Sequence, residues 1–187
     1  MPDVQRVFLS VDIDDDALLT RILHIQGKLD RQAAKLKIVE PRNIHFTVRF
    51  FGDTSSTKIE SINDTLRQLE FAPFTIHIDG VGAFPSISKP RVIWVGVVQN
   101  ADAFIDLKQD VDLLLGQLGY PPDRKFKPHA TIARVRAVRN RENVVKNLES
   151  IAHESVGTMT VGTIRMTKST LTPQGPIYKT LWEIPTK

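Results

Sequence analysis

The chain alternates between segments with a two-residue hydrophobic period and longer segments with a helical period. Residues 6–12 place Val7, Leu9 and Val11 on one side and predict a strand. Residues 14–36 predict a helix, with aspartates in its first turn, where the helix dipole favours negative charge. The same patterns predict further strands over 44–50, 74–84, 91–98, 128–134, 158–171 and 177–184, and further helices over 55–69, 103–118 and 141–151.

The order of these elements indicates the fold class. Several predicted strands follow one another without a helix between them, which favours antiparallel or mixed pairing in an α+β fold. No low-complexity segment or long linker divides the 187 residues, and this length suits one compact unit or at most two. Each half contains a long helix, then a strand with a His-x-Thr triplet, then another helix and more strands. We therefore expect two related lobes that face each other.

Composition excludes several classes of protein. The chain has no cysteine, so disulfides, thiolate metal sites and cysteine nucleophiles are excluded. Its apolar runs are far shorter than the ~20 residues of a membrane-spanning helix. The N-terminal segment becomes acidic after five apolar residues, unlike a signal peptide, so we expect a cytoplasmic protein without a membrane partner. The formal charge of +4 permits a phosphate-bearing partner without requiring one.

Two of the five histidines share one local pattern. They occur in the triplets His45-Phe46-Thr47 and His129-Ala130-Thr131, each in a short apolar strand. Residues i and i+2 of a strand share a face, so each histidine projects together with its threonine. We interpret the other three histidines, His24, His77 and His153, as structural or surface residues.

Two histidines and two threonines suit acid–base chemistry on a phosphate. Imidazoles that titrate near neutral pH can divide the roles of proton donor and acceptor. The hydroxyls of Thr47 and Thr131 can donate to phosphate oxygens, and Arg134, five residues after His129, can bind a phosphate through its guanidinium. Arg134 belongs to a basic stretch over residues 124–141, which is typical either of a solvated face or of an anion site.

A metal site is the competing interpretation. Neither triplet has an acidic residue two positions from its histidine, and the usual His-x-x-x-His and His-x-x-Glu spacings are absent from the sequence. The sequence also lacks the glycine-rich loops that bind ATP or NAD. We therefore expect neither a metal nor a cofactor.

The two triplets resemble the paired His-x-Thr-x motifs of the 2H phosphoesterases, and within them the RNA 2′,3′-cyclic phosphodiesterases, also called 2′-5′ RNA ligases. The similarity includes the first motif with its flanks (39–52), the segments 82–85 and 90–97, the second motif (126–134) and the closing segment (171–178).

This resemblance implies a single domain over residues 1–187, made of two pseudo-symmetric lobes. Two antiparallel sheets would form a V-shaped cleft, with the helices outside. It implies hydrolysis of RNA 2′,3′-cyclic phosphate ends to 2′-phosphates without a metal, and reversible joining of 2′-5′ linked RNA ends without ATP. His45 would be the proton donor and His129 the acceptor, and Thr47, Thr131 and Arg134 would bind the phosphate.

Some questions stay open at this level. Phe8 lies on the strand face opposite Val7 and Leu9, where it is a candidate either for stacking on an RNA base or for filling the cleft wall. The same motifs are compatible with a module that binds RNA ends or nucleotide phosphates without turnover, or with an esterase for a small cyclic phosphate. A monomer is the simplest expectation for the oligomeric state.

Overall fold

The computed structural model describes residues 3–187 and confirms the α+β class. All strand pairs in this part of the chain are antiparallel, and the strands follow the order β7-β4-β5-β6-β3-β1-β8-β9, with β2 beside β6. The elements are β1 (Val4–Asp12), α1 (Asp16–Gly27), β2 (Ala34–Ile38), a short 3-10 helix (Pro41–Asn43), β3 (His45–Ser55), α2 (Ser56–Leu66), β4 (Phe74–Phe84), β5 (Val92–Gln99), α3 (Ala101–Gly116), β6 (His129–Val138), α4 (Arg141–Ser150), β7 (Ser155–Val161), β8 (Thr163–Thr172) and β9 (Gly175–Pro185).

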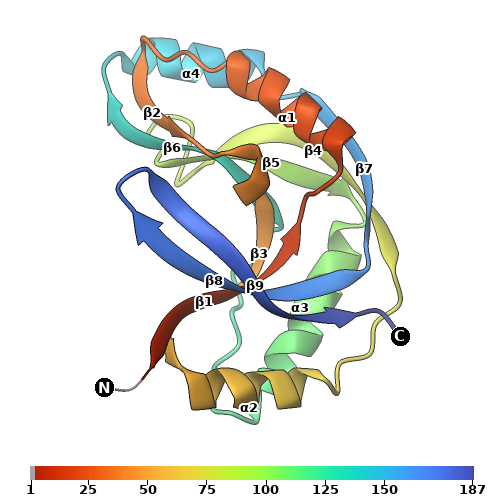
Figure 1. Ribbon diagram of the computed structural model, residues 1–187. Coiled ribbons are helices and arrows are strands. Elements are labelled where there is room, and N and C mark those ends of the chain that lie inside the picture. The colour runs from red at the N-terminus through yellow and green to blue at the C-terminus, as the bar shows by residue number, and fades with distance from the viewer. Residues whose placement is uncertain (1–2) are drawn as a thin grey trace.

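The nine strands of residues 3–187 form one hydrogen-bonded sheet, rather than the two separate sheets expected from the sequence, but it divides in space into two parts, which we name as two sheets (Figure 1). We call β3, β1, β8 and β9 the His45 sheet, and β7, β4, β5, β6 and β2 the His129 sheet. A single pair of Cα partners, Phe46 and Ala130, joins them through β3 and β6. Each sheet takes strands from both halves of the chain, since β8 pairs with β1 and β7 pairs with β4. The two sheets are therefore interleaved in sequence.

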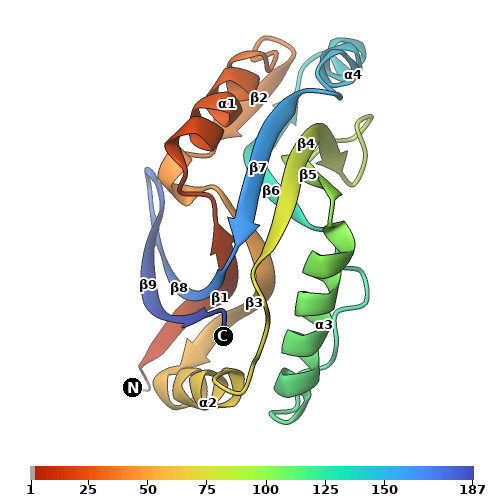
Figure 2. The same ribbon diagram turned by 90° about the vertical axis from the view of Figure 1, so that its right-hand side faces the viewer.

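The helices lie on the outside of the two sheets. Helices α1 and α4 lie over the His129 sheet, and α2 lies below the His45 sheet (Figure 1). Helix α1 packs on β6 and β7, while α2 packs on β3 and on α3, whose C-terminal end lies near it (Figure 2). No helix within residues 3–187 is long and apolar enough to cross a membrane.

The predicted helix over residues 14–36 is wrong in its second half. Helix α1 begins after Asp15, whose carboxylate caps the backbone N–H of Leu18 over 2.9 Å, and it ends at Gly27. Asp30 then accepts two backbone N–H groups in a turn, and the chain enters β2. Gly27 and Asp30 are ordinary signals for a helix end and a turn, but the apolar residues of β2 continue the helical period by coincidence.

The predicted strand over residues 158–171 is two strands in the structure. Strand β7 pairs with β4 in the His129 sheet, and β8 pairs with β1 in the His45 sheet. The chain passes from one sheet to the other at Gly162, which lies between Val161 and Thr163. This crossing needs no reversal of direction, and an isolated glycine, Gly162, is the sign of it in the sequence.

Candidate active site

The two His-x-Thr segments lie side by side where the sheets meet. Phe46 and Ala130, the Cα partners of this junction, are both fully buried. Neighbouring side chains of a strand point to opposite faces, so the histidine and threonine of each segment point away from this core. In antiparallel pairing about Phe46 and Ala130, each histidine lies opposite the threonine of the other segment. The structure thereby brings both imidazoles and both hydroxyls to one cavity.

A β-bulge follows the threonine in each of these strands. Val48 is the extra residue of β3 in its pairing with β1, and Ile132 is the extra residue of β6 in its pairing with β5. A bulge shifts the alternation of faces by one residue. The third residue after each threonine therefore shares its face, and these residues are Phe50 in β3 and Arg134 in β6, both of which line the cavity.

Helix α1 stabilises the bulge in β6. The carbonyl oxygen of Ile132 accepts the backbone N–H of Val39 over 3.0 Å and the side-chain Nε2 of Gln26 over 2.9 Å. Gln26 is 2% exposed, and its Nε2 also lies 2.9 Å from the carbonyl oxygen of Val39. The polar side chain on the buried face of α1 thus fixes the strand that bears His129 and Arg134.

His45 is held by its strand neighbours and by two aromatic rings. Its Nδ1 donates to the carbonyl oxygen of Asn43 over 2.7 Å, so the neutral ring has its lone pair on Nε2, which faces the Thr47 hydroxyl at 3.0 Å. The ring of Phe8 stacks on the imidazole with centroids 4.8 Å apart, and Tyr178 contacts it edge-on at 5.5 Å. These contacts fix both the tautomer and the plane of the imidazole.

His129 has a similar backbone contact and a different set of neighbours. Its Nδ1 donates to the carbonyl oxygen of Lys127 over 2.7 Å, which again leaves the lone pair on Nε2. Phe84 contacts the imidazole edge-on at 4.8 Å, and the Trp94 ring centroid lies 6.1 Å away. The Lys127 ammonium lies 4.6 Å from the centroid of the Trp94 ring, so this cation is held close to His129.

The charges around the two imidazoles differ. Burial lowers the pKa of both histidines below its usual value. The positive charge of Arg134 acts in the same direction on both, and Lys127 adds to this effect at His129. A carboxylate, Asp12, opposes the shift only at His45. The Asp12 carboxylate therefore partly offsets the lowered pKa of His45, and no carboxylate does so for His129.

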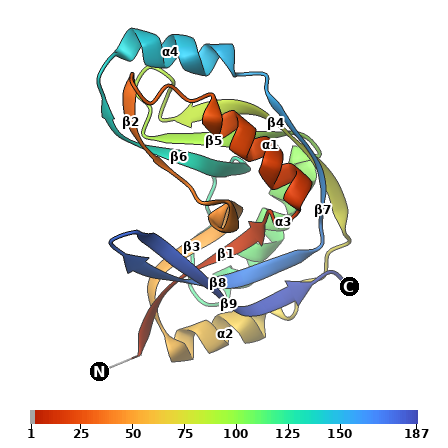
Figure 3. The same ribbon diagram turned by 45° about the horizontal axis from the view of Figure 1, so that its top comes forward.

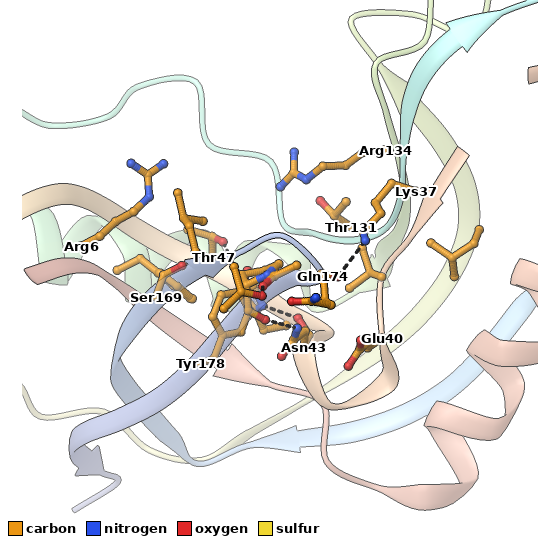
Figure 4. Close-up of a pocket in the computed structure, with 18 of the residues that line it drawn as sticks. Arg6, Lys37, Glu40, Asn43, Thr47, Thr131, Arg134, Ser169, Gln174 and Tyr178 are labelled. Carbon is orange, nitrogen blue, oxygen red and sulfur yellow. Dashed lines mark hydrogen bonds between the residues drawn. The ribbon is translucent and has the colours of Figure 1, made fainter. Parts of the chain in front are cut away.

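The cavity between the sheets has a volume of about 590 Å³ and is rich in cations. The hairpin of β8 and β9 faces β2 and β6 across it (Figure 3), and Lys37 on β2 donates to the carbonyl oxygen of Gln174 in that hairpin over 2.8 Å. Arg6 lies at one end, and Lys37 and Arg134 lie at the other (Figure 4). Glu40 also lines the cavity. Its size and charge suit an anion larger than free phosphate.

All the site residues expected from the sequence line this cavity. His45, Thr47, His129, Thr131 and Arg134 are among them, and their chemical roles stay predictions. The remaining one, Phe8, also lines it but is 4% exposed.

Sequence reasoning missed other lining residues. Lys37 comes directly after the wrongly predicted part of the first helix, in the strand β2 that the sequence analysis did not predict. Plain alternation along the strand would place Phe50 on the core face with Phe46, and the bulge at Val48 reverses this. Gly52, a glycine inside a strand pattern two residues after Phe50, was the available signal.

The side chains of this cavity suit a phosphate better than a metal ion. Residues 3–187 contain no group of three or more His, Cys, Asp or Glu side chains placed to hold a metal ion. The two histidines instead contact threonine hydroxyls, aromatic rings and backbone carbonyls.

Comparison with known proteins gives the family. A model described as LigT-like phosphoesterase matches the chain twice, over residues 12–94 and 95–178. The chain is 40% identical over 177 residues to the RNA 2′,3′-cyclic phosphodiesterase of Methanothermobacter thermautotrophicus, covering 92% of this chain and 94% of that protein. It is 38% identical over 176 residues to the protein of the same name from Archaeoglobus fulgidus, covering 94% and 97%.

Solved structures share the fold. TT0787 of Thermus thermophilus superposes with a TM-score of 0.77 at 26% identity, covering 96% of this chain and 97% of that one. E. coli LigT complexed with 3′-AMP superposes with a TM-score of 0.78 at 21% identity, covering 98% and 99%, which is a likeness of fold. The sequence resemblance to the 2H phosphoesterases is thereby confirmed. With its two family matches, its relatives and its paired histidine strands in agreement, the chain belongs to the LigT-like phosphoesterase family.

Proposed function

We propose that this protein hydrolyses RNA 2′,3′-cyclic phosphodiester ends to 2′-phosphomonoesters, by acid–base catalysis with two histidines and without a metal. The observation that carries the proposal is the pair of imidazoles in one cation-lined cavity, each with its Nδ1 bound to a backbone carbonyl, which leaves Nε2 as the atom for proton transfer. The names of the relatives support the choice of substrate. The reaction needs one proton accepted and one donated, which two such rings supply.

The proton transfers follow from this arrangement. His129 Nε2 accepts a proton from water as the water oxygen attacks phosphorus. The bond from phosphorus to the ribose 3′-oxygen breaks, and His45 Nε2–H donates its proton to that oxygen. The products are a 2′-phosphate and a free 3′-hydroxyl. Asp12 near His45, and Lys127 near His129, support this assignment of acid and base.

The remaining residues bind the phosphate. In the proposal the Thr47 and Thr131 hydroxyls donate to its two non-bridging oxygens, and the Arg134 guanidinium balances its negative charge. Phe8 holds the plane of His45 by stacking and borders the space for the terminal nucleoside. The same groups, with an RNA 5′-hydroxyl in place of water, support 2′-5′ joining without ATP.

We also propose that the chain acts as one monomeric domain of two pseudo-symmetric lobes. The family model matches once in each half, and the two motif strands share the bulge after the threonine. Since the sheets interleave strands from both halves, neither half is expected to fold alone.

The test is incubation with an oligoribonucleotide that ends in a 2′,3′-cyclic phosphate, in excess EDTA, with chromatography that separates 2′- from 3′-phosphate products. We expect a 2′-phosphate. His45→Ala and His129→Ala are expected to lower kcat by about 10²- to 10⁴-fold, the usual contribution of a general acid or base. His153→Ala, at an exposed turn, is the matched control and should retain wild-type activity.

Three outcomes contradict the proposal. Binding of the oligonucleotide without any product indicates an end-binding module. Turnover of small cyclic phosphates but not of RNA indicates a different esterase. Activity that EDTA abolishes and a divalent metal restores contradicts the metal-independent mechanism.

A further inference from the structure

Phe50 offers an exposed aromatic ring at the cavity. Its side chain is 52% exposed, whereas Phe8 is 4% exposed and already stacks on His45. Leu171, 68% exposed, lines the same cavity from β8. Exposed apolar side chains at a polar cavity are typical of a binding surface.

The backbone of β3 directs Phe50 into the cavity. Bulges at Val48 and Phe51 lie on either side of the pair Arg49 and Phe50, and without the first bulge Arg49 would face the cavity instead. Gly52 follows with a φ of 73°, a left-handed conformation that favours glycine. Bulges are common beside active sites, where they aim one side chain.

Phe50 occupies the position in β3 that Arg134 occupies in β6. Each is the third residue after the motif threonine, and each faces the cavity because of a bulge. One motif strand therefore presents a cation beside the histidine pair, and the other presents an aromatic ring. A phosphate bound between the motifs would have a charged group on one side and a stacking surface on the other.

Arg6 adds a cation to the aromatic side. Its guanidinium carbon lies 4.8 Å from the centroid of the Phe50 ring. Within residues 3–187 Arg6 forms no ion pair, although Asp53 is its Cα partner on β3. Lys37 and Glu40 lie at the opposite end of the cavity (Figure 4). Of the phenylalanine and tyrosine rings among the lining residues described, those of Phe8, Phe50 and Tyr178, only the Phe50 ring is exposed.

We propose that Phe50 and Arg6 form a binding site for the nucleotide that precedes the cyclic phosphate end of the RNA. Its base stacks on the Phe50 ring, and the phosphodiester that links it to the terminal nucleotide contacts Arg6. The inference rests on the proposed function and adds to it a preference for RNA of at least two nucleotides. A stacking platform beside a cation is a common way to bind single-stranded nucleic acid with little sequence preference.

The experiment compares three substrates with the same terminal cytidine 2′,3′-cyclic phosphate: the mononucleotide, a dinucleotide with adenosine before it, and a dinucleotide with an abasic ribose there. For the wild type we expect kcat/KM to be about 5- to 150-fold higher with adenosine than with the abasic ribose, as for stacking of one base. Phe50→Ala should bring this ratio close to one, and Phe50→Trp should retain it. Arg6→Gln should lower kcat/KM for both dinucleotides relative to the mononucleotide.

Arg67→Gln is the control for loss of one positive charge, because Arg67 is exposed at the end of α2 and does not line the cavity. It should leave all three values unchanged. A wild-type ratio near one, or a Phe50→Ala variant with the full wild-type ratio, overturns the inference, while turnover of the dinucleotides keeps the proposed function intact. If the wild type cleaves none of the three substrates, the proposed function itself fails.

Discussion

Asp112 is the centre of a buried charge cluster, and its replacement by asparagine should be strongly destabilising. Its Oδ1 accepts from Lys108 Nζ at 2.6 Å and from a terminal nitrogen of Arg49 at 3.0 Å. Its Oδ2 accepts the backbone N–H of Asp123 at 3.0 Å. Lys108 is 1% exposed and Asp112 6% exposed, so solvent does little to screen these charges. The carboxylate joins α3, the strand that carries His45 and the segment that leads to His129.

The expected loss follows from the donors around the carboxylate. Asparagine has one acceptor oxygen and one NH₂ group, so in either orientation the NH₂ faces a donor, and two cations lose their counter-charge. Breaking a buried ion pair on one side typically costs about 3–5 kcal/mol. With a urea m-value of about 2 kcal/mol/M, this lowers the midpoint of unfolding by roughly 2 M.

Replacing one of the cations of this cluster should lower the free energy of unfolding much less than replacing the carboxylate. Lys108→Met leaves Asp112 paired with Arg49, so we expect a loss of about 1 kcal/mol or less, in line with apolar replacements of buried ions. The assay is urea unfolding followed by circular dichroism at pH 7, with both variants beside the wild type. A loss below about 1 kcal/mol for Asp112→Asn, or equal losses for the two variants, refutes the reasoning.

Three further predictions concern the histidines and one close approach of the backbone. Lys127→Gln removes a cation that lowers the His129 pKa, so the acidic limb of kcat/KM against pH should move to higher pH; an unmoved limb contradicts this. Gly82→Ala places a Cβ in steric conflict with the Trp94 ring and should cost about 1–3 kcal/mol in urea unfolding, whereas Gly27→Ala, with no atom within 4 Å, should cost nothing. Because folding lowers the pKa of His45, the unfolded chain binds more protons than the folded chain once the pH falls below about 6.5. The free energy of unfolding should therefore decrease as the pH is lowered through this range. His45→Gln should reduce that fall, and equal pH profiles for the two proteins contradict the assignment.

Local sequence patterns predict much of the secondary structure correctly. The strand predicted over residues 74–84 agrees with β4 at both ends, and the helix predicted from residue 141 begins where α4 begins. These elements have clear periods and clear ends, such as Asn140, which caps α4 at the N–H of Asn143. The prediction was wrong for residues 28–36 because the apolar residues of β2 continue the helical spacing of those in α1.

For the site, the sequence by itself determined the His-x-Thr pairs and which side chains of each pair share a face, because strand alternation is a local property of the backbone. Only the tertiary structure decided that Phe46 and Ala130 pair, which brings the two motifs together from distant parts of the chain. It also decided that bulges direct Phe50 and Arg134 into the cavity. A bulge depends on the pairing of a strand with its neighbour, and that pairing is set by packing across the whole molecule rather than by the residues of the strand itself.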